Sequence, residues 1–136
     1  MEDLLKFGRA ILEFQPFSKL VGAELTSFEA GSAEISLPVR EELKQQHGFV
    51  HGGVVSYLVD NCLTYAGGSV LGDSVTTEYK INFVRPAIGD TLIARSSVIS
   101  SGKRVAVCEC RVFAVKDEQE TLVAAAQGTI QKVEER

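Results

Sequence analysis

Several features common in other protein classes are scarce in this sequence of 136 residues. It has no tryptophan, and its three cysteines are an odd number with no signal-peptide pattern before them. We therefore expect free thiols in a reducing compartment, the cytoplasm. The formal net charge is only −4, with dispersed basic residues, and the first residues contain no apolar run of membrane length. Neither a nucleic acid nor a membrane is an expected partner.

Metal and nucleotide-cofactor sites also lack their usual residues. The two histidines are His47 and His51, and the pattern buries Cys62, so no metal site can be assembled. No glycine pattern of the phosphate-binding or dinucleotide type is present. Strand alternation places Cys108 and Cys110 on a face of small core residues, which favours packing over redox chemistry. A Cys62 nucleophile is disfavoured because no histidine shares its face.

The composition, 45% hydrophobic and 24% charged, is that of a globular protein and favours one domain over residues 1–136. Helical spacing over 2–14 predicts a short amphipathic helix that breaks at Pro16. Alternation predicts a hairpin from strands 20–28 and 33–39. After a long helix that should stop near Gly67-Gly68, four strands follow as a meander: 78–83, 92–99, 104–115 and 121–133. The predicted class is α+β, an antiparallel sheet of about six strands wrapped around one long helix.

The long helix is amphipathic. Its apolar positions recur at three- and four-residue spacings and fill about half of the circumference: Val54, Val55, Leu58, Val59, Cys62, Leu63 and Ala66. The other half is polar: Ser56, Tyr57, Asp60, Asn61 and Thr64. Asp60 lies in the middle of the polar half, and the glycine-rich stretch His51-Gly52-Gly53 precedes the helix. These features predict backbone donors at the helix start and an acid about two turns inside.

One chain alone cannot bring those two features to a single reacting group. Nine residues separate His51 from Asp60, or roughly 13 Å along a helix. If the backbone amides of Gly52 and Gly53 polarise a carbonyl while Asp60 attacks it or activates water, two chains must supply them. A twofold axis that sets two such helices antiparallel would do so. We therefore expect a homodimer.

The spacing Gln45-x-x-Gly48-x-x-His51-Gly52-Gly53, followed by Asp60, resembles the hotdog-fold acyl-CoA thioesterases of the phenylacetate-pathway (PaaI-like) type. The resemblance extends over nearly the whole chain, including the segments NFVRPAIGDTL and GKRVAVCECRVF. It implies the hotdog fold, a working dimer, and dimers that pair into a tetramer. It also implies hydrolysis of an acyl-CoA thioester without a metal or redox cofactor.

The resemblance implies a role for each of several residues. Asp60 falls where the family has its helix carboxylate, which acts as nucleophile or as general base; the sequence does not decide between them. Gly52 falls where a backbone amide at the helix start binds the thioester oxygen. Gln45 falls where an amide side chain orients the reacting groups, and His51 where a histidine positions the thioester end.

The following strand supplies a further catalytic position. Thr76 falls where a hydroxyl contacts the nucleophile or water, although the adjacent Thr77 leaves the register open. Substrate contacts are expected from residues that line the cleft: Phe49, Gly53, Tyr57 and Asn61. Basic side chains are expected to bind the phosphates of coenzyme A: Arg85, Lys103 and Arg104. The alternative is that they are only solvated charges in turns.

Two other functions compete with thioester hydrolysis. One is a hotdog hydratase or dehydratase acting on enoyl or 3-hydroxyacyl thioesters, with His47 or His51 paired to the helix acid. The other is a non-catalytic module that binds acyl-CoA. The motif spacing favours hydrolysis over the first, and the intact Asp60 and Gln45 favour it over the second. Acyl preference is expected to be broad or aromatic, and the sequence leaves open whether coenzyme A or a carrier protein holds the acyl group.

Overall fold

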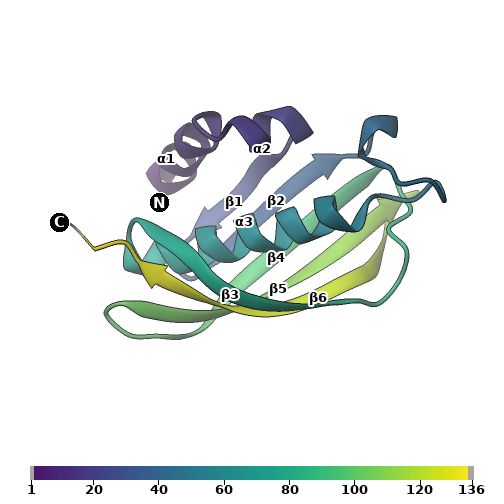
Figure 1. The fold of residues 1–136 in the computed structure, drawn as a ribbon. Coiled ribbons are helices and arrows are strands. Elements are labelled where there is room, and N and C mark those ends of the chain that lie inside the picture. Colours follow the sequence, from purple (N-terminus) through teal and green to yellow (C-terminus); the bar gives the residue numbers. More distant parts are fainter. Residues whose placement is uncertain (1, 135–136) are drawn as a thin grey trace.

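A six-stranded antiparallel sheet curves around one long helix, and two short N-terminal helices lie on the same side of the sheet as that helix (Figure 1). The computed structural model describes residues 2–134. The helices are α1 (Glu2–Glu13), α2 (Pro16–Val21) and α3 (Gly52–Leu71), with a 3₁₀ turn, η1 (Glu41–Leu43). The strands are β1 (Glu24–Glu29), β2 (Ser32–Pro38), β3 (Ser74–Phe83), β4 (Thr91–Ser101), β5 (Val105–Lys116) and β6 (Gln119–Lys132). The predicted α+β class is confirmed.

The strand order is β1-β2-β4-β5-β6-β3, with antiparallel neighbours throughout. Strands β4, β5 and β6 form a meander, but β3 pairs with β6 at the edge of the sheet, so the predicted four-strand meander is wrong for β3. No side chain of β3 is fully buried, whereas alternate residues of β5 are. Such a strand suits an edge position. Segment 84–90 carries the chain across the end of the sheet to β4, where Val84 N and Asp90 N donate to Val123 O and Val115 O.

The core lies between α3 and the concave face of the sheet. All seven apolar positions predicted for α3 are buried, and its five predicted polar positions are only partly buried. The inward residues of β5 are small and buried as predicted: Ala106, Cys108, Cys110, Val112 and Ala114. Small side chains let the helix lie close to the sheet. The alternation in the sequence therefore predicted the core face of β5 correctly.

Helix α3 does not stop at Gly67-Gly68 as predicted but continues to Leu71 and ends at Gly72. Gly72 has φ of 90°, and its N–H donates to Gly68 O at 2.8 Å. A Cβ on Gly67 would lie 2.7 Å from Ile130 atoms, so this glycine permits close packing of α3 on β6 rather than ending the helix. No helix among residues 2–134 combines the length and apolarity that a membrane crossing needs.

The paired glycines of α3 provide a matched test of this packing. Gly67→Ala is expected to lower the free energy of unfolding by about 1–3 kcal/mol, because the new methyl group overpacks against Ile130. Gly68→Ala meets no atom within 4 Å and is expected to raise it by up to about 1 kcal/mol through helix propensity. Urea unfolding of both variants at one protein concentration measures the difference. Equal effects at the two positions would contradict this role for Gly67.

The short helix α2 is absent from the sequence prediction, which begins a strand at Leu20. Pro16 stands in the first turn of α2, where its fixed φ and missing N–H are tolerated. Gly22, with φ of 85°, ends the helix, so the strand begins only at Glu24. Pro16 therefore starts a helix rather than only ending one, and α2 brings the buried Ser18 against α3.

Candidate active site

The N-terminus of α3 has one backbone donor free of internal partners. His51 is the N-cap residue, and its Nδ1 accepts a hydrogen bond from Gly53 N at 2.8 Å. Val54 N and Val55 N both donate to His51 O, at 2.9 and 3.3 Å. Within residues 2–134 the amide of Gly52 has no acceptor outside the helix, and as the first helical residue it has none inside. The Gly52 N–H is therefore available to a ligand, whereas that of Gly53 is occupied.

The cap also fixes the proton on the His51 ring. A ring nitrogen that accepts a hydrogen bond carries no proton, so the neutral imidazole has its proton on Nε2. His51 is exposed, so this second N–H can donate to a bound group at the same end of the helix as Gly52. His51 therefore has both a structural contact and a free donor.

The capping contact can be tested separately from the donor. We expect His51→Ala to lower the free energy of unfolding by about 1 kcal/mol, because the N-terminus of α3 loses its cap. Asparagine is among the best N-cap residues, so His51→Asn should retain wild-type stability while removing the ring donor. Urea titrations at equal protein concentration check both values. A His51→Ala protein as stable as the wild type would show that the cap contributes nothing.

Gln45 lies at the same end of α3 because of a tight turn. Gln45 N donates to Phe49 O, and Gln45 O accepts from Gly48 N, each at 3.0 Å. Gly48 has φ of 90°, a conformation that favours glycine at this position of the turn. The Gln45 side-chain oxygen accepts from His47 N, which leaves its amide NH₂ as a donor. Gln45, His51 and Gly52 thus gather around the start of α3, since His51 N also donates to Leu43 O at 2.8 Å.

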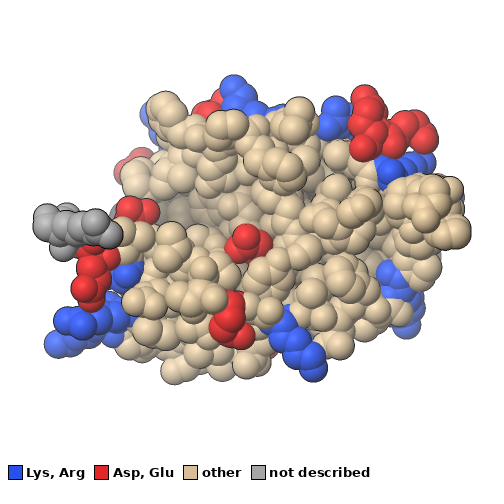
Figure 2. Space-filling model, in the orientation of Figure 1, with Lys and Arg blue, Asp and Glu red and all other residues tan. Residues whose placement is uncertain are grey.

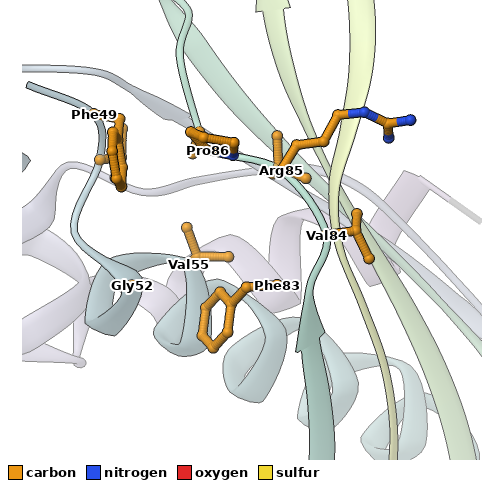
Figure 3. Close-up of a pocket in the computed structure, with 10 residues that line it drawn as sticks. Phe49, Gly52, Val55, Phe83, Val84, Arg85 and Pro86 are labelled. Atoms are coloured by element: carbon orange, nitrogen blue, oxygen red, sulfur yellow. The ribbon is translucent and has the colours of Figure 1, made fainter.

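An apolar cavity of about 380 Å³ lies beside the Gly52 amide (Figure 3). Phe83 packs over the first turn, where a Cβ on Gly52 would lie 3.5 Å from its ring, and Phe49 forms the opposite wall. The side chain of Arg85 extends away from the cavity, and its Nη1 donates to Leu122 O at 3.0 Å. A hydrogen-bond donor in apolar surroundings stabilises negative charge more strongly than one in water.

Asp60 lies two turns further along α3 and is partly buried. Within the described residues its carboxylate has neither a hydrogen-bond donor nor an ion-pair partner. The surface over α3 carries mostly uncharged side chains (Figure 2). A partly buried carboxylate without a partner is available as a base or nucleophile.

A pair of threonines links Asp60 to strand β3. Thr64 Oγ1 donates to the backbone oxygen of Asp60 at 2.8 Å and lies 2.6 Å from Thr76 Oγ1. Because the Thr64 proton is already used, Thr76 must donate to Thr64, and its own lone pairs remain free to accept. Thr77 sits at a register shift of β3, and its hydroxyl donates to Thr129 O at 3.2 Å. Thr76 is therefore the hydroxyl that faces α3.

The segment that holds these groups, except Gln45, matches a known family. The family model described as Thioesterase superfamily matches residues 47–121, from the turn before α3 to the start of β6. The chain belongs to the thioesterase superfamily.

Its relatives include enzymes with stated activities. The acyl-coenzyme A thioesterase PaaI of Escherichia coli is 28% identical over 93% of this chain and 89% of its own. The 1,4-dihydroxy-2-naphthoyl-CoA hydrolase of Listeria monocytogenes is 29% identical over 81% of this chain and 89% of its own. A solved structure of a thioesterase family protein from Silicibacter pomeroyi is similar with a TM-score of 0.87, at 31% identity, over 90% of this chain and 93% of that one. The hotdog architecture expected from the sequence is therefore shown.

In this superfamily member, Tyr57 and Asn61 form a network that ties α3 to α2. Tyr57 Oη donates to the buried Ser18 Oγ at 2.6 Å, and Asn61 Nδ2 donates to Tyr57 Oη at 3.1 Å. Ser18 in turn donates to Gln15 Oε1 at 2.6 Å. Burial raises the pKa of Tyr57, so its hydroxyl stays protonated. The network fixes α2 against α3 at Tyr57 and Asn61.

The basic side chains predicted for coenzyme A do not gather in one place on the chain. Arg85 lies by the start of α3, whereas Lys103 and Arg104 lie by Asp73, just beyond its end. A helix of 20 residues spans about 30 Å. Arg104 also forms an exposed ion pair with Glu134 at 3.5 Å. A single chain therefore cannot place all three on one phosphate group.

Neither metal binding nor cysteine chemistry finds support in the described residues. Residues 2–134 contain no group of three side chains able to hold a metal ion. Burial raises the pKa of the Cys62 thiol, and it raises that of Cys108 to about 11. Buried thiols that stay protonated near neutral pH are poor nucleophiles.

Sequence reasoning overlooked Thr64 as a site residue and treated it only as part of a polar face. The signal was present, because a hydroxyl four residues after Asp60 lies on the same helical face. Its partner Thr76, however, comes from another element, so only the fold shows the contact.

Proposed function

We propose that this thioesterase-superfamily protein hydrolyses acyl-CoA thioesters, with aryl or medium-chain acyl groups, to the free acid and coenzyme A. The observation that carries this proposal is the carboxylate of Asp60, which has no partner within the described residues, on a helix whose first amide, Gly52, is free. The backbone oxygen of Asp60 accepts from Thr64, whose hydroxyl meets that of Thr76 on β3. The activities named for PaaI and for the dihydroxynaphthoyl-CoA hydrolase support it.

The chemistry follows from these groups. Asp60 either attacks the thioester carbonyl carbon or removes a proton from a water that attacks it, and Thr76 accepts a hydrogen bond from that water. The carbonyl oxygen gains negative charge, which the Gly52 N–H and the positive end of the α3 dipole stabilise. When water attacks, the carbon–sulfur bond breaks, the free acid forms, and the proton taken up by Asp60 passes to the sulfur, so that coenzyme A leaves as the thiol. When Asp60 attacks, breaking this bond leaves an acyl anhydride on Asp60. Water then hydrolyses the anhydride to the free acid, restores the Asp60 carboxylate and supplies the proton that the thiolate takes up. His51 and Gln45 orient the thioester through their free N–H donors, and the reaction needs no metal or redox cofactor.

Each site draws on two chains. Gly52 and Asp60 lie about 12 Å apart along one helix, too far to contact one carbonyl group. Strand β3 is a long edge strand with an exposed apolar residue at each end, Val75 and Phe83, and such an edge is a template for pairing. Antiparallel pairing of two β3 strands about a twofold axis would also set the two α3 helices antiparallel. We propose this homodimer as the working unit and a tetramer formed from two dimers.

The proposal also covers the extent of the domain, the cellular compartment and the substrate contacts. Residues 1–136 form one hotdog domain, and the three unpaired buried thiols fit the cytoplasm. Phe49 and the Gly53 backbone line the thioester end of the cleft, and Tyr57 and Asn61 its other side. Coenzyme A phosphates meet basic side chains from the two chains: Arg85, Lys103 and Arg104.

Thiol release from phenylacetyl-CoA and octanoyl-CoA tests the proposed activity. We expect one free thiol and one carboxylic acid for each thioester consumed, and elution in gel filtration at two or four times the chain mass of 14.7 kDa. Addition of water to crotonyl-CoA without thiol release would instead identify a hydratase. Tight binding of acyl-CoA without any turnover would identify a binding module.

A further inference from the structure

Two pairs of hydroxyl groups join α3 to strand β3, which runs alongside it (Figure 1). Thr64 follows Asp60 by one turn and meets the hydroxyl of Thr76. Ser56 precedes Asp60 by one turn and meets the phenol of Tyr79. Residues four apart in a helix lie on one face, with their Cβ atoms about 5–6 Å apart. The Asp60 side chain therefore lies between the two pairs.

A β-bulge allows both hydroxyls of β3 to face the helix. Thr76 and Tyr79 are three residues apart, a spacing that in a regular strand puts side chains on opposite faces. Thr77 is the extra residue at the register shift, so the partners of these two residues on β6, Ile130 and Gly128, are only two apart. Bulges often redirect side chains next to active sites. The irregularity of β3 therefore brings a second hydroxyl, that of Tyr79, to α3.

The position of the Tyr79 ring is also fixed by packing. The ring is partly buried against the core. Gly128 pairs with Tyr79, and a Cβ on this glycine would lie 2.7 Å from the Cβ of Tyr79 and 3.0 Å from Cδ1 of Leu63. No side chain fits there, so Gly128 leaves the space that the Tyr79 side chain needs between β6 and α3.

The two hydroxyl pairs differ in their free protons. Both protons of the threonine pair are used, because Thr64 donates to Asp60 O and Thr76 donates to Thr64. In the Ser56–Tyr79 pair one proton joins the two oxygens, and the other has no acceptor within residues 2–134. Ser56 does not donate to the backbone of the preceding turn, as a serine inside a helix often does. Asp60 therefore has an acceptor pair on one side and a donor pair on the other.

Thioester hydrolysis develops negative charge at two atoms, the carbonyl oxygen and the sulfur of the leaving group. Donors for the carbonyl oxygen gather at the start of α3: the Gly52 amide and the free N–H groups of His51 and Gln45. The sulfur is bonded to the carbon that is attacked at Asp60, so groups one turn from Asp60 are within its reach. A fixed hydroxyl suits this charge, because hydrogen bonds to ionised groups are about twice as strong as those between neutral groups.

We propose that the Ser56–Tyr79 pair binds the sulfur of the departing thiolate through its free hydroxyl proton. The proposal rests on the proposed thioester hydrolysis at Asp60. The threonine pair accepts from water on one side of the carboxylate, and the Ser56–Tyr79 pair holds the sulfur on the other. The hydrogen bond stabilises the charge on sulfur as the carbon–sulfur bond breaks. No proton leaves the pair, so the source of the thiol proton and the products of the reaction are unchanged.

Two thioesters with the same acyl group and different leaving groups test this contact. Octanoyl-CoA releases a basic alkyl thiolate, whereas the octanoyl thioester of nitrothiophenol releases an acidic aryl thiolate that needs little stabilisation. The double variant Ser56→Ala/Tyr79→Phe removes both hydroxyls, keeps the ring and leaves no partner unpaired, so it should fold normally. We expect its kcat/KM to fall about 10–100-fold for octanoyl-CoA, the usual effect of a hydrogen bond to a charged group, and less than threefold for the aryl thioester.

A second phenol of α3 supplies the control. Tyr65 Oη donates to Gly8 O at 2.8 Å, so its proton is already used. Tyr65→Phe should change the rates of both thioesters by the same factor. Equal losses with the two thioesters in the double variant, or no loss with octanoyl-CoA, would overturn the proposed contact, because a purely structural contact does not distinguish leaving groups.

Binding of the product tests the contact without turnover. Asp60→Ala has neither a charge nor a donor at position 60, and calorimetry at about pH 9, where a thiol is partly ionised, compares coenzyme A with desulfo-coenzyme A. We expect coenzyme A to bind at least threefold more tightly, and the double substitution at Ser56 and Tyr79 to remove this preference. No preference, or one that persists, would overturn the contact even if the wild type hydrolyses thioesters. A preference lost with the pair would support it even if the wild type released no thiol, and then only the proposed hydrolysis would fail.

Discussion

Replacing Asp60 by asparagine is expected to lower kcat/KM for octanoyl-CoA by about 10³ or more. The substitution keeps the shape of the side chain but removes the charge that acts as base or nucleophile, and such groups typically contribute 10²–10⁴. Thiol release at saturating and at limiting substrate measures the change. We expect the loss mainly in kcat, because asparagine keeps the shape of the side chain and leaves the start of α3 intact.

The control is an acid away from α3. Asp117 lies exposed in the turn between β5 and β6 with φ of 51°, a conformation that asparagine accepts well. Asp117→Asn should therefore retain wild-type turnover. Stability should not fall in Asp60→Asn, because the carboxylate has no partner to lose within the described residues. An Asp60→Asn enzyme within tenfold of the wild type would exclude this carboxylate from the reaction.

Removing the Gly52 donor should lower kcat by about 10²–10³, the usual effect of deleting one oxyanion donor. Gly52→Pro deletes this N–H and little else, since proline is favoured at the first helical position. His51 already has the extended conformation that a following proline requires, with φ of −58° and ψ of 135°. Gly52→Ala keeps the N–H, and its Cβ would make only ordinary contact with Phe83, so this control should stay close to wild type. Equal activity in the proline and alanine variants would contradict the assignment.

Mixed dimers reveal whether the two groups act across the interface. One chain carries Asp60→Asn and the other Gly52→Pro, and different tags isolate the dimer that contains both. If each site takes Gly52 from one chain and Asp60 from the other, one site is complete and about half of wild-type turnover returns. If a single chain supplies both groups, this dimer stays inactive. A wild-type chain paired with a doubly substituted chain gives the opposite pattern and serves as the cross-check.

Local periodicity predicted those parts of the fold where burial alone decides the outcome. The apolar stripe of α3 and the small-residue face of β5 were confirmed. Successive side chains turn by about 100° in a helix and 180° in a strand, so spacing alone indicates which of them face the core. The φ of 90° at Gly48 was not predicted, because the motif records only the spacing of this glycine from Gln45. The family was also within reach of the sequence, because the spacing from Gln45 to Asp60 lies in one continuous segment.

Tertiary structure decided what depends on distant partners. Strand β3 lies at the edge of the sheet next to β6, and none of its side chains is fully buried there. No short window of sequence shows which strand will lie beside it. The Gly67-Gly68 pair looked like a helix stop, yet Ile130 on β6 makes Gly67 a packing residue.

The site divides in the same way. The sequence by itself placed Asp60 inside α3 and the start of that helix at the glycine pair, because both follow from helical geometry, and the structure confirms these two positions. The second chain at the site stays a prediction. Only the fold decided that Thr76 rather than Thr77 faces α3, and that Gly52 rather than Gly53 keeps a free amide. Each of these depends on a hydrogen bond. The spacing of residues in the sequence specifies neither the partner of that bond nor its geometry.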